Sequence, residues 1–477
     1  MIAQRLTARR LVQLLGDWRG DGHSYLELSD SVALLARDGT VPVGTALPAE
    51  RPLAEALGVS RTTVSASYQR LRESGLAHSR QGSGTVIRSQ RPGPREDAVD
   101  GLAEIDLTTA CPAPWQGLST LSARAFAEYP DAFQLLGYDT IGREDLRRAI
   151  ADRYSARGLP TTPEQIMVTL GAQHANFLVA RTLLRRGDRS LIESPSYPNA
   201  REALAATGAL VAELPVASDG YDAASIVDIA KRTSPCLAYL IPDNHNPTGQ
   251  SMPEELRTEL ISTLTAQGAY ILADETTAEL TLGPPRLVSP FAAAAEHSHQ
   301  QDAIITVGSL GKSVWGGLRI GWIRATPELI SRLEVSRRIG DLGTGTWEQV
   351  IALLALERYD DILAERAVEH AAQYRVLAEQ VSAHFPEWTL PRVGGGVSTW
   401  VDLGGRHSTR LARAGAREGV RIAPGPRFGS PGVFERFIRF PFSAPAADLR
   451  ESVRRLRAGW DADAGADRSV LAAQTVI

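Results

Sequence analysis

The chain has 477 residues, 43% of them hydrophobic, and a formal net charge of −4. Its length predicts a large globular domain with a smaller one attached, and the net charge excludes a uniformly basic protein. It contains no run of about eighteen apolar residues, and the arginine-bearing N-terminal segment has no central apolar block, so we expect neither a membrane span nor a secretory signal and place the protein in the cytoplasm.

Positive charge gathers at the start of the chain. Residues 1–90 hold eleven arginines against eight acidic residues, and the remainder carries a net charge of −7. A small basic module on an acidic body fits a protein that meets the phosphate backbone of DNA. The cysteines, Cys111 and Cys236, form no metal or redox motif, and we expect two buried thiols and no metal site.

Lysine is nearly absent. The chain contains Lys231 and Lys312 and no other lysine, although lysine and arginine together number 51. Chemistry that needs a side-chain amine therefore has two candidates.

Helices and a hairpin are predicted before residue 88. Apolar residues at helical spacing mark amphipathic helices over 2–16 and 24–37. Two shorter helices follow, separated by Gly58, and Ser60 can cap the second one. A glycine-tipped hairpin over 78–87 comes next. This order predicts a winged helix-turn-helix domain over residues 1–88.

The rest of the chain is predicted to form a linker, an α/β domain and a tail. Residues 89–104 are rich in proline, glycine and charge, which predicts a linker. From 105 to 462 short apolar runs alternate with helical stretches, as is typical of buried strands in a mainly parallel sheet. Residues 463–477 are expected to form a loose tail. Strands are expected at 165–169, 190–193, 237–241, 270–273 and 303–307.

The segment from Leu47 to Val64, followed by Leu71 to Gly75 and by Gln81 to Gly84, resembles the GntR-type winged helix. Its second helix turns small hydroxyls and one arginine away from the apolar face, a composition that suits the major groove. The resemblance implies double-stranded DNA as a partner. It places DNA contacts at Arg51, Ser60, Arg61, Thr62, Thr63, Ser65, Gln81 and Gly82.

Two of these residues have a plainer interpretation. In that interpretation Ser60 is a helix cap that does not contact DNA, and Thr63 contributes to packing and does not contact DNA. Ser65 stands where relatives commonly carry an arginine, so that contact differs here.

The segment from Gly308 to Trp322 resembles the Schiff-base motif of fold-type I aminotransferases. The resemblance implies that Lys312 binds the aldehyde of pyridoxal 5′-phosphate. Ser309 and Arg319 stand where the family binds the cofactor phosphate. A glycine turn after a strand also attracts a phosphate to the following helix N-terminus, and here that turn is formed by Gly171, Ala172 and Gln173.

The same resemblance assigns the remaining cofactor contacts. Tyr197 matches the residue that stacks on the pyridine ring, and Asn246 matches the one that reaches the ring oxygen. Asp274 matches the carboxylate that keeps the ring nitrogen protonated, so that the ring withdraws electrons. Thr276 stands where many relatives have a tyrosine. Arg439 matches the arginine that binds the carboxylate of the amino substrate.

A winged helix ahead of a fold-type I domain is the layout of MocR-type regulators, which this chain resembles over nearly its whole length. The resemblance implies a cytoplasmic homodimer that senses a small amino-compound effector, or the cofactor itself, and regulates transcription. Two alternatives stay open: a working aminotransferase with an appended DNA-binding domain, and a scaffold without cofactor. The second is disfavoured by the position of Lys312 in a lysine-poor chain.

Overall fold

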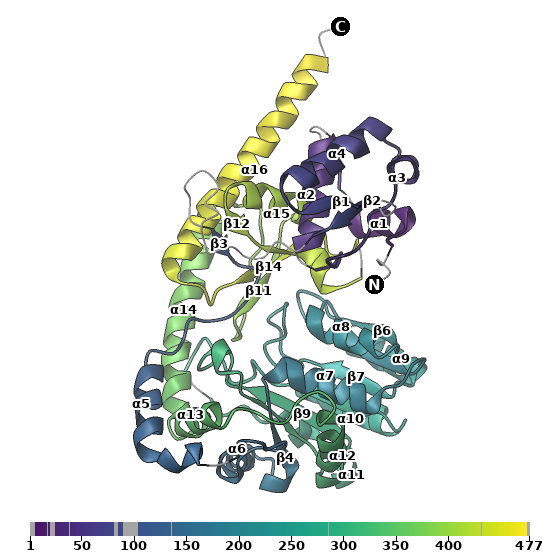
Figure 1. Cartoon of the computed structure of the whole chain (residues 1–477). Coiled ribbons are helices and arrows are strands. Elements are labelled where there is room, and N and C mark those ends of the chain that lie inside the picture. Colours follow the sequence, from purple (N-terminus) through teal and green to yellow (C-terminus); the bar gives the residue numbers. More distant parts are fainter. Residues whose placement is uncertain are drawn as a thin grey trace.

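The computed structural model describes residues 5–16, 18–19, 24–37, 39–80, 84–88, 104–134, 136–284, 286–430 and 432–474. These residues form a small helical module and a larger α/β body that itself has two parts, as Figure 1 shows. No helix in these ranges combines the length and apolar character that crossing a membrane requires.

The small module is a winged helix, as predicted. Gly58 ends α3 in the left-handed conformation, with φ 64°, and donates its N–H back to the helix. Ser60 then caps α4 by accepting a hydrogen bond from the N–H of Thr63 at 3.1 Å. The elements are α1 Ala8–Leu15, α2 Ser24–Arg37, α3 Glu50–Leu57, α4 Arg61–Glu73, β1 Ala77–Arg80 and β2 Gly84–Ile87.

One apolar cluster joins these helices. Val64, Tyr68 and Leu71 recur at helical spacing on α4 and are buried against Leu28 of α2 and Leu53 of α3. The first helix begins later than predicted, at Ala8 rather than near residue 2. Within the expected linker only Glu104 lies in the described ranges, and the wing residues Gln81 and Gly82 lie outside them.

The larger part of the body is a seven-stranded sheet in the order β4-β10-β9-β8-β7-β5-β6. All neighbouring strands run parallel except β10, which is antiparallel to both β4 and β9. The predicted mainly parallel sheet is therefore confirmed. The strands are β4 Ile166–Thr169, β5 Arg189–Ser194, β6 Leu210–Pro215, β7 Leu237–Leu240, β8 Tyr270–Asp274, β9 Ile304–Ser309 and β10 Gly321–Arg324.

Helices cover both faces of this sheet. Alternate strand residues belong to different cores: Ile271 packs with α6, α9, α10 and α13, and Leu272 packs with α7, α8 and α12. Both faces are therefore buried, which explains the continuous apolar runs in the sequence. The helices of this part are α5 Leu118–Glu128, α6 Glu144–Ala156, α7 Ala172–Leu183, α8 Pro198–Ala206, α9 Ala223–Thr233, α10 Glu254–Thr265, α11 Ser298–Asp302, α12 Pro327–Arg337 and α13 Thr346–Leu356.

The second part of the body, here called the small domain, follows the long helix α14. Figure 1 shows α14 running from the large sheet to this domain. Its apolar core joins α14, β11, α15, β14 and α16. The elements are β3 Ile105–Asp106, α14 Tyr359–His384, β11 Ser398–Asp402, α15 Ser408–Arg417, β12 Val420–Arg421, β13 Ala423–Pro424, β14 Phe437–Pro441 and α16 Ala446–Gln474.

The prediction of a loose tail from residue 463 is wrong. Helix α16 begins in the small domain and continues to Gln474. The segment after residue 460 is rich in alanine, which has the highest helix propensity, so the packed start of α16 extends with little cost.

The winged helix contacts the small domain through α2 and α15. The buried guanidinium of Arg413 donates from Nη1 to the Trp18 carbonyl at 2.9 Å, the Glu27 carbonyl at 3.2 Å and Ser31 Oγ at 3.1 Å. Arg417, one turn later, pairs with Asp30 at 2.8 Å. The Arg413 side chain is buried at this contact, and desolvation lowers its pKa. The α2–α15 contact therefore links the two modules.

Candidate functional site

The predicted site residues meet at the carboxyl edge of the sheet, as parallel strands require. There they surround one cavity of about 630 Å³, large enough for a cofactor and a small ligand. Of the cofactor residues predicted from the sequence, Gly171 alone is not part of the lining. The predicted residues that line it are Ala172, Gln173, Tyr197, Asn246, Asp274, Thr276, Ser309, Lys312, Arg319 and Arg439.

Lys312 follows β9 and turns its amine into the cavity. Nζ donates to the carbonyl of Ala110 at 2.6 Å. Desolvation is the main cause that lowers the pKa of Lys312, and the Arg439 guanidinium adds to the lowering. An amine with a lowered pKa is more often neutral and therefore more nucleophilic. The site thus supplies the reactive amine that an aldehyde needs.

Asp274 ends β8 and faces the cavity with a fixed carboxylate. Oδ2 accepts from Tyr239 Oη at 2.8 Å and from Asn176 Nδ2 at 3.1 Å, and Oδ1 accepts from the N–H of Thr276 at 3.1 Å. Three donors hold this carboxylate in one orientation. It can therefore pair with a protonated ring nitrogen.

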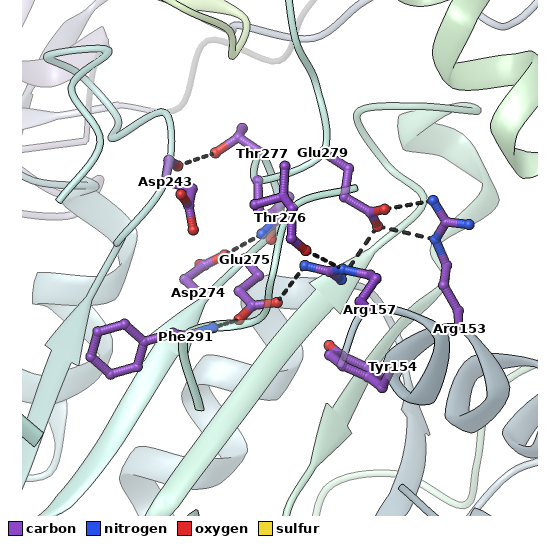
Figure 2. A network of polar contacts seen from close by, with 12 residues as sticks. Arg153, Tyr154, Arg157, Asp243, Asp274, Glu275, Thr276, Thr277, Glu279 and Phe291 are labelled. Carbon is purple, nitrogen blue, oxygen red and sulfur yellow. Dashed lines mark hydrogen bonds and ion pairs between the residues drawn. The ribbon is translucent and has the colours of Figure 1, made fainter. Parts of the chain in front are cut away.

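A buried ionic network holds the chain just after Asp274. Figure 2 shows Glu275 pointing toward Arg157, and their charged atoms lie 3.2 Å apart with both side chains almost fully buried. Arg157 also approaches Glu279 at 3.4 Å, and Glu279 pairs with Arg153 at 2.5 Å. Burial raises the pKa of Glu275, which the Arg157 charge opposes. Two cations and two anions thus fix the loop that presents Asp274 and Thr276.

The side of the cavity where the sequence predicts the cofactor phosphate is built from a glycine turn and an arginine. Gly171 has φ 84°, and a Cβ added there would lie 2.7 Å from Nη2 of Arg319. A side chain at residue 171 would therefore displace this guanidinium. Arg319 donates to the Leu170 carbonyl at 2.8 Å, while Ser309 Oγ donates to the Ile320 carbonyl at 3.0 Å.

Arg439 lies on β14 of the small domain and reaches the same cavity. Its side chain is buried, donates to the Thr108 carbonyl and lies 5.2 Å over the ring of Phe428. Desolvation lowers the pKa of Arg439 to about 10. A desolvated guanidinium of this kind favours an anionic partner such as a carboxylate.

Unpartnered polar atoms show what the cavity would accept. Among the residues that the structure describes, Asn246 Oδ1, Thr276 Oγ1, Gln173 Oε1 and Arg439 Nε are buried without a hydrogen-bond partner, and all four side chains line the cavity. Buried polar groups are nearly always paired in folded proteins, so these four atoms can bind polar groups of a ligand in the cavity. Together with Lys312, the set fits pyridoxal 5′-phosphate and an amino compound.

Several residues that line the cavity or bind a lining residue were not predicted from the sequence. Tyr239 and Asn176, which bind Asp274, lie on β7 and α7, and only the folded sheet brings them to β8. Residues 108–111 also line the cavity. The prediction of two buried thiols is wrong, because Cys111 and Cys236 are both exposed. Cys111 belongs to this lining loop, and Cys236 lies where the chain enters β7.

Those predicted DNA-binding residues that the structure describes lie on α3 and at the start of α4. Arg51, Ser60, Arg61 and Thr62 are exposed, while Thr63 and Ser65 are half-buried. Arg61 pairs with Glu50 at 3.1 Å, yet its side chain remains 73% exposed. Ser60 is a cap, as its plainer interpretation required, and its hydroxyl also lies 2.7 Å from Thr62 Oγ1. The N-terminal end of α4 therefore presents hydroxyls and a guanidinium to the outside.

Comparisons with known families match both modules. Residues 123–456 match the model described as aminotransferase class I and II, and residues 25–87 match that of bacterial regulatory proteins, gntR family. The 2-aminoadipate transaminase of Thermus thermophilus is 30% identical over 66% of this chain and 79% of its own length. The HTH-type transcriptional regulator TauR of Rhodobacter capsulatus is 28% identical over 92% of this chain and 96% of its own.

A solved structure agrees with the fold of the body. LysN, an alpha-aminoadipate aminotransferase from Thermus thermophilus complexed with N-(5′-phosphopyridoxyl)-L-leucine, superimposes with a TM-score of 0.67 at 26% identity. The match covers 77% of this chain and 93% of that one. TauR is thus similar to nearly the whole chain, whereas the two aminotransferases are similar to about 66% and 77% of it.

Proposed function

Because the chain belongs to the class I and II aminotransferase family and carries a gntR-family DNA-binding domain ahead of it, we propose that it regulates transcription in response to an amino compound bound at its cofactor site. One observation carries this proposal. Helix α15 lines the cofactor cavity with Ala412 and Ala416 and holds the winged helix with Arg413. A ligand in the cavity and the DNA-binding module therefore touch the same helix.

The cofactor is pyridoxal 5′-phosphate, which supplies an aldehyde that condenses reversibly with amines and a ring that withdraws electrons. In this proposal Asp274 would hold the ring nitrogen, Tyr197 would pack against the ring, and Asn246 and Thr276 would bind its oxygen. Because the Thr276 side chain is shorter than that of a tyrosine, its hydroxyl would hold the ring less firmly. The phosphate would be held by Ala172, Gln173, Ser309 and Arg319, and the absence of a side chain at Gly171 would leave room for the Arg319 guanidinium.

The effector enters beside these residues. The carboxylate of the effector would bind Arg439, whose Nε has no partner among the described residues, and this would place the primary amine of the effector beside Lys312 and the cofactor aldehyde. A ligand shifts an equilibrium between two arrangements only if it binds one of them more tightly. The effector would contact Lys312 on the large sheet and Arg439 on the small domain. When these two parts move relative to each other, only one arrangement keeps both contacts, and the effector therefore binds that arrangement more tightly.

Exposed apolar side chains support a homodimer. Leu136 and Tyr138 are 93% and 79% exposed, and Ile339 and Leu342 are 72% and 55% exposed. The two segments are adjacent because Asp139 bridges to Gly343. An apolar surface of this kind is usually covered by a partner, and a second copy of the chain would place two winged helices on two half-sites. Since operator DNA lies in the bacterial cytoplasm, we place the protein there.

Arg439→Ala is expected to keep basal operator affinity and to lose the response to the effector, because the carboxylate then has no cation to bind. The measurement is the dissociation constant for an operator, selected from a random-sequence pool, with and without the effector. Arg436→Ala is the matched control, since Arg436 precedes the same strand, is 55% exposed and pairs with Asp402 instead of lining the cavity. A full response in Arg439→Ala would show that no carboxylate is bound at this arginine.

Replacing Arg51 or Arg61 by glutamine is expected to weaken operator binding and to flatten its salt dependence. Each lost phosphate contact reduces the slope of log K against log salt by about 0.9, because fewer counterions are released. Arg332→Gln on α12 is the control, as an exposed arginine outside the winged helix. An unchanged slope in both Arg51→Gln and Arg61→Gln would contradict the placement of DNA on α3 and α4.

The open alternative is a working aminotransferase. Two relatives named as transaminases are each 30% identical to this chain over the matched segments, and the cavity holds the lysine and the arginine that such an activity would need, Lys312 and Arg439. Incubation with an amino donor and an excess of keto acceptor separates the two functions. Repeated turnover would establish the enzyme, whereas a spectral change that saturates at one equivalent of donor supports the regulator.

A further inference from the structure

The wall of the cofactor cavity includes residues of the DNA-binding module. Leu34 and Arg37, in the last turn of α2, line the cavity together with Ala412 and Ala416 of α15 and with Arg421 of β12. Leu34 also packs against the apolar core of the small domain. The outer end of the cavity thus lies between the winged helix and the small domain, so its shape depends on how these two parts are docked.

The lining of this cavity is strongly positive. The only carboxylate among the lining residues described is that of Asp274, and the cationic side chains are Arg37, Lys312, Arg319, Arg421, Arg427 and Arg439. A cofactor phosphate and one ligand carboxylate would balance part of this charge, at Arg319 and Arg439. These two groups would leave the charges of the outer arginines, Arg37, Arg421 and Arg427, without a counter-charge within the lining.

Two of the outer arginines have carboxylate partners outside the lining. Arg421 lies 3.1 Å from Glu104 and 3.5 Å from Asp106, and Arg427 lies 2.8 Å from Glu202. Arg37 differs from both. It is exposed, and within the described part of the chain no carboxylate approaches its guanidinium within 4.0 Å. Among the described residues, Arg37 is therefore an outer cation of the cavity wall without a carboxylate partner; the adjacent Asp38 lies outside those residues.

We propose that Arg37 binds a second anionic group of the effector, so that the ligand is an amino acid with an additional acidic group at its distal end. This inference rests on the proposed function, in which the amine meets the cofactor beside Lys312 and the first carboxylate binds Arg439. Because Arg37 belongs to α2, the distal group binds the DNA-binding module directly. Such a ligand favours the docked arrangement of the winged helix over any arrangement that removes α2 from the cavity.

The test compares ligands that differ in the distal charge alone. The full-length, cofactor-loaded protein is titrated with L-aspartate and L-asparagine, with L-glutamate and L-glutamine, and with the acid–amide pair one methylene longer, and the cofactor absorbance gives each dissociation constant. Because Arg37 is exposed, an ion pair with the distal group is expected to contribute up to about 1 kcal/mol, which corresponds to about fivefold in affinity. We expect the acid of at least one pair to bind about fivefold more tightly than its amide.

Arg37→Gln is expected to bring the acid and the amide of that pair to within about twofold of each other, because the distal charge loses its partner. Arg9→Gln is the matched control, since Arg9 is exposed on α1 of the same module and does not line the cavity. It should keep the preference of the unchanged protein. The ratio within one pair cancels any general effect of a substitution on cofactor loading.

The other outcomes overturn the inference in distinguishable ways. Equal affinities for acid and amide in the unchanged protein, or a preference that persists in Arg37→Gln, would overturn the role of Arg37 while leaving effector sensing intact. If no amino acid perturbs the cofactor absorbance of the unchanged protein, the proposed function itself fails, and the role of Arg37 fails with it.

Discussion

Lys312→Ala is expected to lose all covalent attachment of the cofactor while the chain remains folded. Lys312 is the only lysine that lines the described cavity, and its amine is desolvated there. After borohydride reduction and digestion, the unchanged protein should carry the added mass on the peptide that contains Lys312. The variant should carry none, because an alanine has no amine to condense with the aldehyde.

Lys231→Ala is the control for this experiment. Lys231 lies exposed near the end of α9, and its loss should leave the added mass on Lys312 unchanged. A thermal unfolding curve for Lys312→Ala separates loss of the bond from loss of the fold. Cofactor mass found on another amine of the Lys312→Ala variant would show that the assignment is wrong.

The second large effect is expected at the contact between the modules. Arg413→Ala removes the guanidinium that donates to the carbonyls of Trp18 and Glu27 and to Ser31 Oγ. Each buried acceptor left without a donor costs about 1–3 kcal/mol, so the winged helix should separate from the small domain far more often. Hydrogen exchange of the α2 amides is the measurement, and we expect it to accelerate about tenfold or more.

Arg417→Ala is the matched control on the same helix. Arg417 pairs with Asp30 and with Asp463, but its side chain is 46% exposed, and exposed ion pairs contribute about 0–1 kcal/mol. Its loss should change the exchange of α2 by a few-fold at most. Equal effects of the two substitutions, or no effect of Arg413→Ala, would contradict the role assigned to Arg413.

The sequence predicts best those features that depend on neighbours along the chain. The apolar runs locate β4, β5, β7, β8 and β9, because strands buried on both faces need continuous apolar residues. Motifs that follow these strands must then meet at one edge of a parallel sheet, which is why Asn246, Asp274 and Lys312 line a common cavity. Local capping likewise locates the boundary between α3 and α4.

Contacts between distant segments could not be predicted in this way. Tyr239 binds Asp274 because β7 and β8 are neighbours in the sheet, and nothing local to either residue requires this order. The docking of α2 on α15 depends on the fit of two surfaces from opposite ends of the chain. The tail was mispredicted because alanine extends a helix through propensity, without the apolar periodicity on which the prediction depended.

The scarcity of lysine has a consequence for the chemical reactivity of this protein. One of the two side-chain amines, Lys231, is exposed, and the other, Lys312, faces the cofactor cavity. An acylating reagent therefore has one freely accessible side-chain target and one whose acylation competes with the cofactor. The ratio of label at the two positions, read in a single mass spectrum, reports the fraction of molecules that carry the cofactor.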